Sequence, residues 1–424
     1  MYLLSNVTRP YAWGSTTAIA RALGREPSGG PEAELWIGAH PDAPSIAHTA
    51  TGDVPLNELI AADPHGTLGE ESRSAFGDRL PYLLKLLAAE GALSLQVHPT
   101  LEQARRGFAA EEAAGVPRTA AHRNYKDDNH KPEMILALTG FEALCGFRAL
   151  SESARYFDLL AIETRHPVVE EIAGILRAGI VGSESSGAAP DAQSNALRQA
   201  FERLIVGGGD VTEALAATHT YLADAGVDAL DASLRTVLDL EAEYPGDAGA
   251  LISLLLNRVH LEPGECISMP AGNVHAYLHG LGVEVMAASD NVLRGGLTPK
   301  HVDVPELLGT IDFRALPVPE VHPEETSLGQ SIFDPGFGEF ALQRFDLAAG
   351  DAPVPLAQQG ALLVLLLEGS AVLDSPRGDL VLHRGESAFA AASEAPVMVH
   401  SESGCVGFAV TTAIRGAAQS TLGA

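Results

Sequence analysis

Short apolar runs separated by Gly, Pro and Asp turns dominate both ends of this chain, whereas its middle has a helical pattern. Residues 80–87 are apolar enough for a buried helix or strand, and residues 93–97 are expected to form a strand. Two more strands are predicted at 134–138 and 144–147, around the turn Thr139-Gly140. The first third of the chain is therefore expected to be mainly β.

Helical spacing marks the centre of the sequence. Residues 101–115 favour a helix, because Ala, Glu and Arg are dense there and the segment ends in Gly. From 150 to 255 apolar residues recur every three or four positions, which predicts a helical block. The small polar segment 181–194 is expected to interrupt this block as a mobile loop.

The β pattern returns near residue 257. Strands are predicted at 258–261 and 266–269, on either side of a Pro-Gly turn. Segments 362–374, 380–392 and 395–402 each indicate a strand–turn–strand unit, and regularly spaced short strands are typical of a jelly roll.

The predicted fold class is mainly β with a helical insertion. We expect a cupin or jelly-roll catalytic domain, an α-helical domain and a C-terminal jelly-roll domain. The expected boundaries are 1–149 plus 256–319 for the first, 150–255 for the second and 320–424 for the third.

Composition narrows the range of partners. The chain has 424 residues, 46% of them hydrophobic, which is enough for several cores. Its net charge of −28 argues against binding to nucleic acids or anionic membranes, so an anionic ligand would need a locally basic pocket. The three cysteines are far apart, and the N-terminal residues do not resemble a secretory signal. We therefore expect a cytoplasmic protein, with a monomer as the default.

Candidate metal ligands lie in three short stretches. Gln96 and His98 are two residues apart on an extended segment, so their side chains point to the same face. Glu133 ends the sequence His-Lys-Pro-Glu, and His275 follows a Pro-Ala-Gly corner. Two imidazoles, one carboxylate and one amide oxygen suit a catalytic divalent metal that acts as a Lewis acid.

Longer stretches around these residues resemble the type I mannose-6-phosphate isomerases of the cupin superfamily. The resemblance runs in order over about residues 1–310 and is carried by the segments 11–15, 33–41, 80–99, 123–138, 141–148 and 269–301. It implies one Zn²⁺ per chain, bound by Gln96, His98, Glu133 and His275. It also implies interconversion of mannose 6-phosphate and fructose 6-phosphate, by proton transfer between C1 and C2 through a cis-enediol. Mannose catabolism and supply of GDP-mannose are both possible roles.

The resemblance also directs attention to catalytic candidates near the ligands. Arg294 and Lys131 are expected to be essential, although the sequence does not divide the work between them. Asp290 could be an acid or base, could assist ring opening, or could serve only in a turn. His130 is a further candidate with the same alternatives.

Phosphate recognition is expected to use Arg294 and Lys300, with Ser94 and the backbone amides of Gly295-Gly296. Lys85 is another candidate cation, although a salt bridge beneath the sheet is an equal alternative, and Tyr277 could line the pocket. Many family members carry a lysine two positions after the Pro of the QVHP motif. This chain has Leu101 there, so any contact made by that lysine must be absent or supplied elsewhere.

Two other functions stay open at the level of sequence. A cupin-type iron oxygenase could use the same donor types, although such sites usually have two His and one carboxylate. A non-catalytic sugar-phosphate-binding protein could retain the fold without turnover. The cationic segment around Arg294 favours an isomerase acting on a sugar phosphate over both.

Overall fold

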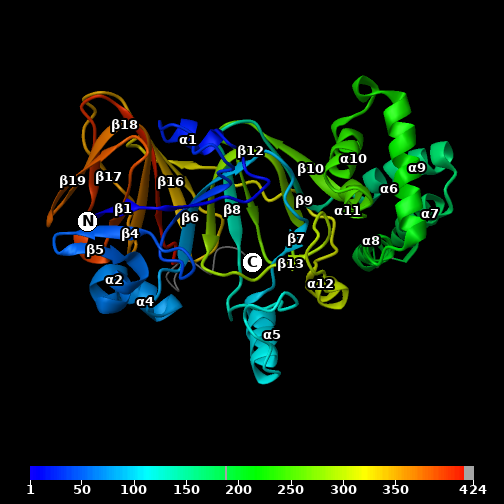
Figure 1. Ribbon diagram of the computed structural model, residues 1–424, viewed down its shortest axis with the longest axis horizontal. Helices are drawn as coiled ribbons and strands as arrows, with labels where there is room; N and C mark the ends of the chain where they lie inside the picture. The colour runs from blue at the N-terminus through cyan, green and yellow to red at the C-terminus, as the bar shows by residue number, and fades with distance from the viewer. Residues whose placement is uncertain (187–188, 415–424) are drawn as a thin grey trace.

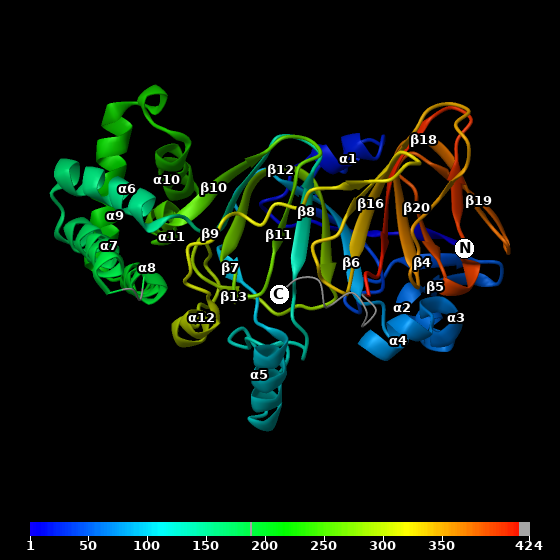
Figure 2. The same ribbon diagram turned by 180° about the vertical axis from the view of Figure 1, so that it is seen from behind.

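The computed structural model describes residues 1–186 and 189–414 as an elongated molecule with three parts in a row (Figures 1 and 2). A helical block occupies one end, a β unit lies in the centre, and the C-terminal strands form a second β unit at the other end. This mainly β architecture with a helical insertion is the predicted fold class.

The central unit is built on a ten-stranded sheet. Its strands are β2 (Val7–Arg9), β3 (Glu34–Ile37), β6 (Tyr82–Ala89), β7 (Gln96–Val97), β8 (Glu133–Ala137), β9 (Phe141–Phe147), β10 (Leu256–Leu261), β11 (Cys266–Met269), β12 (His275–Ala287) and β13 (Leu293–Arg294). The predicted strands are all present, although only Gln96 and Val97 of the expected 93–97 strand pair as one.

Strand β12 organises this sheet. Its first residues pair with β7 and β9, whereas Gly280–Ala287 pair with β6. The change of partners follows a register shift between Tyr277 and His279, and Gly280 has a φ of +123°. A Cβ at Gly280 would lie 2.7 Å from the Gly140 carbonyl oxygen, so only glycine fits this bend. The bend places His275 near Gln96 on β7.

The second β unit is a twelve-stranded sheet that includes strands from both ends of the chain. Its C-terminal strands are β14 (Glu324–Glu325), β15 (Gln330–Phe333), β16 (Ala341–Leu347), β17 (Val354–Pro355), β18 (Leu362–Ser375), β19 (Gly378–His383), β20 (Ser387–Ala390), β21 (Met398–His400) and β22 (Cys405–Thr411). The N-terminal strands β1 (Tyr2–Ser5), β4 (Ile46–Thr49) and β5 (Gly52–Pro55) join it through the pairing of β1 with β20.

Two local predictions in this unit were wrong. Segment 362–374 was expected to turn back, but it forms the single long strand β18. The strand bends at an irregularity near Glu368 and Gly369 and then exchanges β20 and β22 for β19 and β21 as partners. Segment 395–402 contains only the short strand β21. Segment 380–392 does form two strands around a turn, β19 and β20, although both pair with β18 and not with each other.

The apolar run in β6 is explained by burial on both faces. Tyr82, Leu84 and Leu86 pack toward the C-terminal sheet in one large core, together with residues such as Leu363 and Phe408. Leu87 points instead into a core inside the central unit. A strand buried on both faces has no polar alternation, which is why residues 80–87 also fitted a helix.

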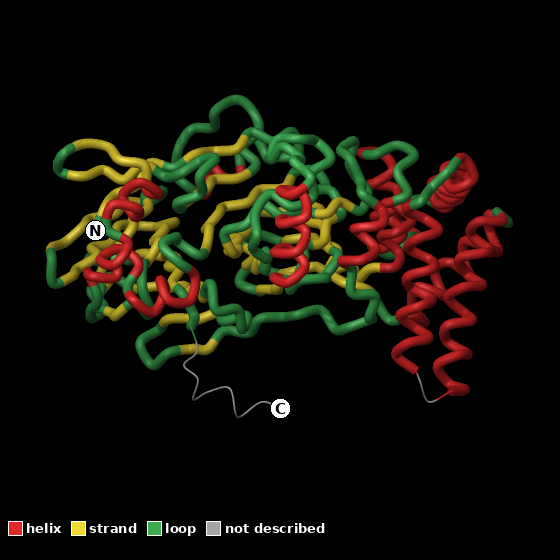
Figure 3. The backbone as a smooth tube through the Cα atoms, turned by 90° about the horizontal axis from the view of Figure 1, so that it is seen from below, coloured by secondary structure: helices red, strands yellow, loops and turns green. Residues whose placement is uncertain are grey.

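The helical block consists of α6 (Leu150–Thr164), α7 (Pro167–Ser186), α8 (Ala189–Ile205), α9 (Gly209–Ala225), α10 (Ala232–Glu243) and α11 (Gly249–Ile252). These helices gather at one end of the molecule (Figure 3). The mobile loop expected at 181–194 was wrong over most of its length, because α7 extends to Ser186 and α8 begins at Ala189; positions 187–188 lie outside the described residues. Small residues such as Ala and Ser are compatible with helix, so their low hydrophobicity was a poor sign of a loop.

Helix α5 (Leu101–Ala113) projects from the central unit and confirms the helix predicted at 101–115 (Figure 1). It begins with a capping box, in which Thr100 and Gln103 exchange side-chain and backbone hydrogen bonds. The remaining helices are α1 (Ala18–Ala22), α2 (Leu56–Ala62), α3 (Pro64–Leu68), α4 (Glu70–Phe76) and α12 (Val304–Thr310). Among the described residues, no helix combines the length and apolar character needed to cross a bilayer.

Candidate metal centre

Three of the four predicted metal ligands converge in the central unit. Glu133 opens β8, His275 opens β12, and His98 follows β7 directly. The Glu133 Oε1 atom lies 3.3 Å from His98 Nε2, and its Oε2 atom lies 3.2 Å from His275 Nε2. All three side chains are almost fully buried, so their donor atoms face one another away from bulk water.

The donor atoms of this cluster are those a metal would use. His98 Nε2 and Glu133 Oε2 are buried without a hydrogen bond to any described residue. The opposite ring nitrogens are occupied: Nδ1 of His98 lies 2.7 Å from the Asn291 carbonyl oxygen, and Nδ1 of His275 lies 3.0 Å from that of Asn273. Donation from Nδ1–H leaves both Nε2 lone pairs directed at the cluster, as in metal-binding histidines. The residues present therefore fit a divalent ion.

The protonation states of the cluster residues also suit a metal ion. Burial lowers the pKa of His98 to about 4, so the ring is neutral and able to ligate near pH 7. Burial opposes ionisation of Glu133, but Lys131, His98 and His275 outweigh it and hold the pKa of this carboxyl well below its usual range. A neutral imidazole and a carboxylate are the forms that a metal requires.

Gln96, the fourth predicted ligand, lies at the edge of this cluster. Its Nε2 atom is 3.2 Å from His275 Nε2. In this orientation the amide N–H can donate to the His275 Nε2 lone pair. Rotation of the amide by half a turn would instead present Oε1 to the same point, as a metal would require. In the sheet, Gln96 stands opposite His275 on one side and Arg294 on the other.

Arg294 is thereby fixed next to the ligand strand. Burial lowers the pKa of its guanidinium, and among the described residues no carboxylate forms an ion pair with it. Burial first, and then the charges of Arg294 and Lys126, also lower the pKa of the exposed Lys300. Ser94 lies beside this group, since Leu95 exchanges two backbone hydrogen bonds with Gly295 and Gly296. Arg294 and Lys300 thus form no ion pair with a described carboxylate, although Asp247 accepts a hydrogen bond from the backbone of the same turn at Thr298.

The two remaining predicted lysines are already paired with carboxylates. Lys131 Nζ lies 2.9 Å from Glu133 Oε1. Lys85 Nζ lies 2.8 Å from Glu284 and 3.8 Å from Glu34, and its buried ammonium also contacts the Trp36 ring. Burial opposes the charge of Lys85, but the surrounding carboxylates raise its pKa above the usual value. The structure thus contains the salt bridge that was the alternative to a phosphate contact.

Tyr277 lies two residues beyond His275, with the two rings 6.2 Å apart. Its hydroxyl is buried and has no hydrogen-bond partner among the described residues. Burial, followed by the Glu284 and Glu133 carboxylates, raises the pKa of this hydroxyl well above its usual value. Tyr277 is therefore a neutral wall of the metal cluster.

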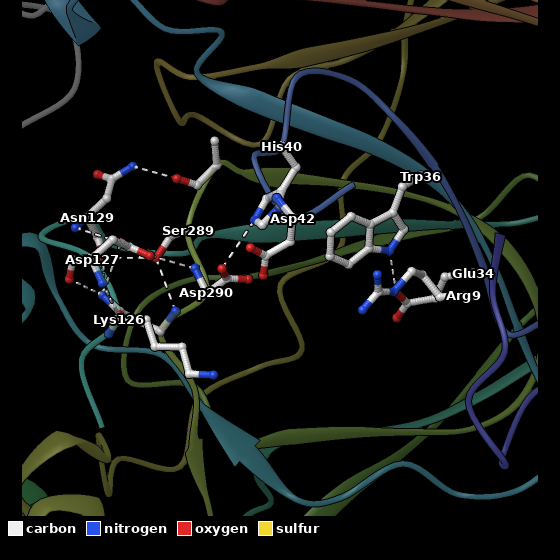
Figure 4. A network of polar contacts seen from close by, with 12 residues as sticks. Arg9, Glu34, Trp36, His40, Asp42, Lys126, Asp127, Asn129, Ser289 and Asp290 are labelled. Carbon is white, nitrogen blue, oxygen red and sulfur yellow. Dashed lines mark hydrogen bonds and ion pairs between the residues drawn. The ribbon is translucent and has the colours of Figure 1, made fainter. Parts of the chain in front are cut away.

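Asp290 and His130 were predicted as possible acid–base groups, and they have different neighbours. Asp290 lines a cavity of about 510 Å³ and pairs with His40, at 3.3 Å between Oδ2 and Nε2 (Figure 4). His130 instead faces the C-terminal unit, where its Nε2 atom lies 2.5 Å from Glu339 Oε1.

Three residues with contacts to these groups were missed by sequence reasoning: His40, Glu339 and Asn291. His40 was detectable as part of the segment 33–41, which carries the family resemblance, but Glu339 had no local signal. Asn291 is fully buried; its carbonyl oxygen orients His98, and its side chain bonds the backbone of Lys126 and Asp127.

Comparison with known proteins gives a consistent picture. Residues 1–150 match the family model "Phosphomannose isomerase type I, catalytic domain". The chain is 41% identical over 404 residues to a mannose-6-phosphate isomerase of Escherichia coli, covering 94% of this chain and 97% of that protein. It is 32% identical over 417 residues to the Bos taurus protein of the same name, covering 93% and 94%.

Solved structures agree. A single-residue variant of phosphomannose isomerase from Salmonella typhimurium has a TM-score of 0.86 and 35% identity, covering 98% of this chain and 100% of that one. A zinc-bound mannose 6-phosphate isomerase has a TM-score of 0.85 and 36% identity, covering 97% and 99%. Because relatives at 41% and 32% identity cover more than nine tenths of it, the chain belongs to the type I mannose-6-phosphate isomerase family.

Proposed function

We propose that this chain is a zinc-dependent aldose–ketose isomerase that interconverts mannose 6-phosphate and fructose 6-phosphate through a cis-enediol. One observation carries the proposal: two donor atoms, His98 Nε2 and Glu133 Oε2, are buried without a partner among the described residues, in a cluster that Gln96, the sheet neighbour of Arg294, borders. A buried polar atom without a partner is costly, so these atoms are explained by a ligand. The names of the relatives supply the substrate and the metal.

One Zn²⁺ per chain would be held by Gln96, His98, Glu133 and His275. When bound, the ion supplies positive charge next to the substrate oxygens, which favours the developing enediolate. Asn291 and Asn273 accept hydrogen bonds from the two histidines and so keep their rings in the ligating orientation.

Lys131 is our candidate for moving the proton between carbons. Its Nζ atom lies at the edge of the cluster, 2.9 Å from Glu133, and only its neutral amine could accept a proton. In the open-chain aldose, the proton leaves C2, a C1–C2 double bond forms, and O1 gains a proton. Return of a proton to C1, with loss of the O2 proton, gives the ketose. His130 stays a second candidate, although Glu339 occupies its Nε2 atom.

The phosphate group would be bound by Arg294 and Lys300, with Ser94 and the Gly296 amide. The predicted contact from the Gly295 amide is wrong, because this N–H donates to the Leu95 carbonyl oxygen. A guanidinium without a carboxylate partner is suited to a phosphate, because it can donate two parallel hydrogen bonds. Lys85 and Tyr277 stay predicted substrate contacts; the two carboxylates around Lys85 make an additional phosphate contact less favourable there than at Arg294.

A coupled assay on mannose 6-phosphate tests the function. Turnover should disappear on chelation and return with Zn²⁺. Glu133→Ala should lose the metal, whereas Arg294→Ala should keep the metal and lose turnover, with a raised KM. A metal-loaded wild-type chain without isomerase activity would refute the proposal. We also propose a cytoplasmic monomer, which light scattering of the purified chain and fractionation of cells would test.

A further inference from the structure

The connection between α10 and α11 contacts the segments that carry the proposed phosphate ligands. At the end of α10, Glu243 Oε2 accepts a hydrogen bond from the Ala92 backbone N–H at 2.8 Å, and the Tyr244 hydroxyl donates to the Ala92 carbonyl oxygen at 2.6 Å. In Figures 1 and 2, β7 and β13 lie on the side of the central unit that faces the helical block. The helical block therefore reaches the segments next to Gln96 and Arg294.

Asp247 ties this connection to the turn that follows β13, residues 294–300. Its Oδ2 atom accepts a hydrogen bond from the Thr298 backbone N–H at 3.3 Å, and its Oδ1 atom accepts one from that of Gly249 at 2.7 Å. The Thr298 hydroxyl oxygen in turn accepts a hydrogen bond from the Lys300 backbone N–H at 3.1 Å. One carboxylate of the helical block thus holds the end of the turn on which Lys300 lies.

The other end of the turn is held by the central unit. The Leu95 N–H donates to the Gly296 carbonyl oxygen at 3.1 Å, and the Leu95 carbonyl oxygen accepts from the Gly295 N–H at 2.8 Å. Arg294 immediately precedes these glycines and pairs with β7. Arg294 and Lys300 are therefore fixed by two different parts of the molecule, and their spacing depends on the residues between them.

Leu297, between these two ends, has a backbone conformation that leucine rarely adopts. Its φ is +55°, in the left-handed region, and the residue is only 1% exposed. The other non-glycine residue with positive φ in the described part of the chain is Arg165, which ends helix α6, where this conformation is common. Leu297 is not at a helix end, so its strained conformation must be maintained by its surroundings.

Gly249 provides the space that the Leu297 side chain occupies. A Cβ at Gly249 would lie 2.7 Å from Leu297 Cγ and 2.9 Å from Asp247 Oδ1. The Leu297 side chain also belongs to a large core that the helical block shares with the central unit and that contains Leu251 and Leu254. This packing, together with the hydrogen bond from Asp247 to the following residue, holds the left-handed conformation.

We propose that the helical block sets the spacing of Arg294 and Lys300, and that Asp247 and Leu297 are positioning residues for recognition of the substrate phosphate. This inference rests on the proposed function, because that function assigns the phosphate to these two cations. Neither positioning residue needs to touch the substrate. Each acts by fixing the turn before the substrate arrives, so that less ordering is required when the phosphate binds.

Two substitutions at Leu297 test the role of its backbone conformation. Ile has the volume of Leu but is branched at Cβ, which makes a positive φ much less accessible, whereas Met is unbranched and similar in volume. In the zinc-loaded enzyme, Leu297→Ile should raise the KM for mannose 6-phosphate by about 10-fold and change kcat by less than about twofold. Leu297→Met should raise KM much less.

Inhibition by inorganic phosphate separates positioning from a merely structural role. The Ki of phosphate should rise in parallel with KM in Leu297→Ile, because both constants report binding at the turn, whereas a smaller fraction of folded enzyme would lower kcat and leave both unchanged. Equal KM and Ki values in Leu297→Ile and Leu297→Met would overturn the role of Leu297.

Variants of the helical block test the connection itself. Gly249→Ala should displace the turn, because the added Cβ would overlap Leu297, and Asp247→Ala removes the hydrogen bond to Thr298. Both should raise KM and the Ki of phosphate by about 10-fold without loss of zinc. Asp247→Asn, which keeps one acceptor oxygen, should restore part of what Asp247→Ala loses. The matched control is Gly174→Ala in α7, where nothing lies within 4 Å of the added Cβ, and it should change neither constant.

Calorimetric titration of the zinc-loaded chain with inorganic phosphate separates this inference from the proposed function. If the wild type binds phosphate more tightly than Gly249→Ala but does not isomerise mannose 6-phosphate, the proposed function fails and this inference stands. If the wild type isomerises mannose 6-phosphate, and Gly249→Ala and Asp247→Ala retain its KM and Ki, this inference is overturned and the proposed function stands. Should Gly249→Ala fail to fold, Asp247→Ala and the two Leu297 variants decide between these outcomes.

Discussion

The two β units of this molecule use their interiors differently. The central unit buries a network of charged groups, including Lys85, Glu284, Lys131 and Glu133. The inner core of the C-terminal unit consists of aliphatic and aromatic side chains, and its buried Glu394 is neutralised by the N-terminal amine at 2.5 Å. Two β units with similar sheets can therefore have different roles. The central unit contains the candidate site, and the C-terminal unit packs against it as a support.

The difference lies in which buried atoms lack a partner. In the C-terminal unit, the buried amides of Gln330 and Gln343 are hydrogen-bonded to backbone carbonyls. In the central unit, His98 Nε2 and Glu133 Oε2 are not hydrogen-bonded to described residues. The C-terminal unit also contains one such atom, Gln358 Oε1, so a single unpartnered atom is not enough. Two of them within one buried cluster of potential metal ligands distinguish the central unit.

Removal of a proposed metal ligand should have the largest effect. We expect His98→Ala to lose bound zinc and to reduce turnover on the order of 1,000-fold, because Lewis-acid assistance supplies several kcal/mol. The matched control is His383→Ala in the C-terminal unit, where the histidine is exposed. Elemental analysis and the coupled assay measure both. Equal losses in the two variants would show that the units do not differ as described.

The buried ion pair should have the largest effect on stability. Lys85→Met leaves Glu284 buried and uncompensated, which should lower the free energy of unfolding by about 3–5 kcal/mol. Adding Glu284→Met should recover only part of this loss, because Glu34, the second buried carboxylate near Lys85, is still present. The exposed pair Arg106–Glu102 is the control, and Arg106→Met should change stability by less than about 0.5 kcal/mol. Urea unfolding of both variants distinguishes these outcomes.

The metal-free central unit should also lose stability in mild acid. The pKa of His98 is lowered from 6.5 to about 4, so between these values the unfolded chain binds a proton that the folded chain does not. The contribution of His98 is fully present above pH 6.5 and is lost as the pH falls to about 4. This contribution to the free energy of unfolding is about 3 kcal/mol. His98→Gln should flatten the dependence of unfolding on pH, whereas His383→Gln should not.

Much of the central unit could be predicted from the sequence, whereas the contacts between distant segments could not. Alternation, turns and the spacing of Gln96 and His98 depend on local backbone geometry, so the strands of the central unit were predicted. The partners of Asp290 and His130 were not, because His40 and Glu339 are 250 and 209 residues away in the chain. The long strand β18 was missed because a change of sheet partners leaves no mark in the pattern of apolar residues.

The contact between the two units should have the smallest effect, and it tests how separate they are. His130 belongs to the central unit and Glu339 to the loop before β16. Burial opposes ionisation of Glu339, but His130 outweighs it and lowers the pKa, so this stabilisation is present near neutral pH and is lost as the pH falls below the usual range of a glutamate. Glu339→Gln should therefore cost about 1–2 kcal/mol at pH 7. Glu325→Gln, which removes an exposed carboxylate bonded to Ser331, is the control and should cost less than about 0.5 kcal/mol. If turnover falls and stability is unchanged, the C-terminal unit contributes to catalysis through His130. The C-terminal unit would then be part of the site and not only its support.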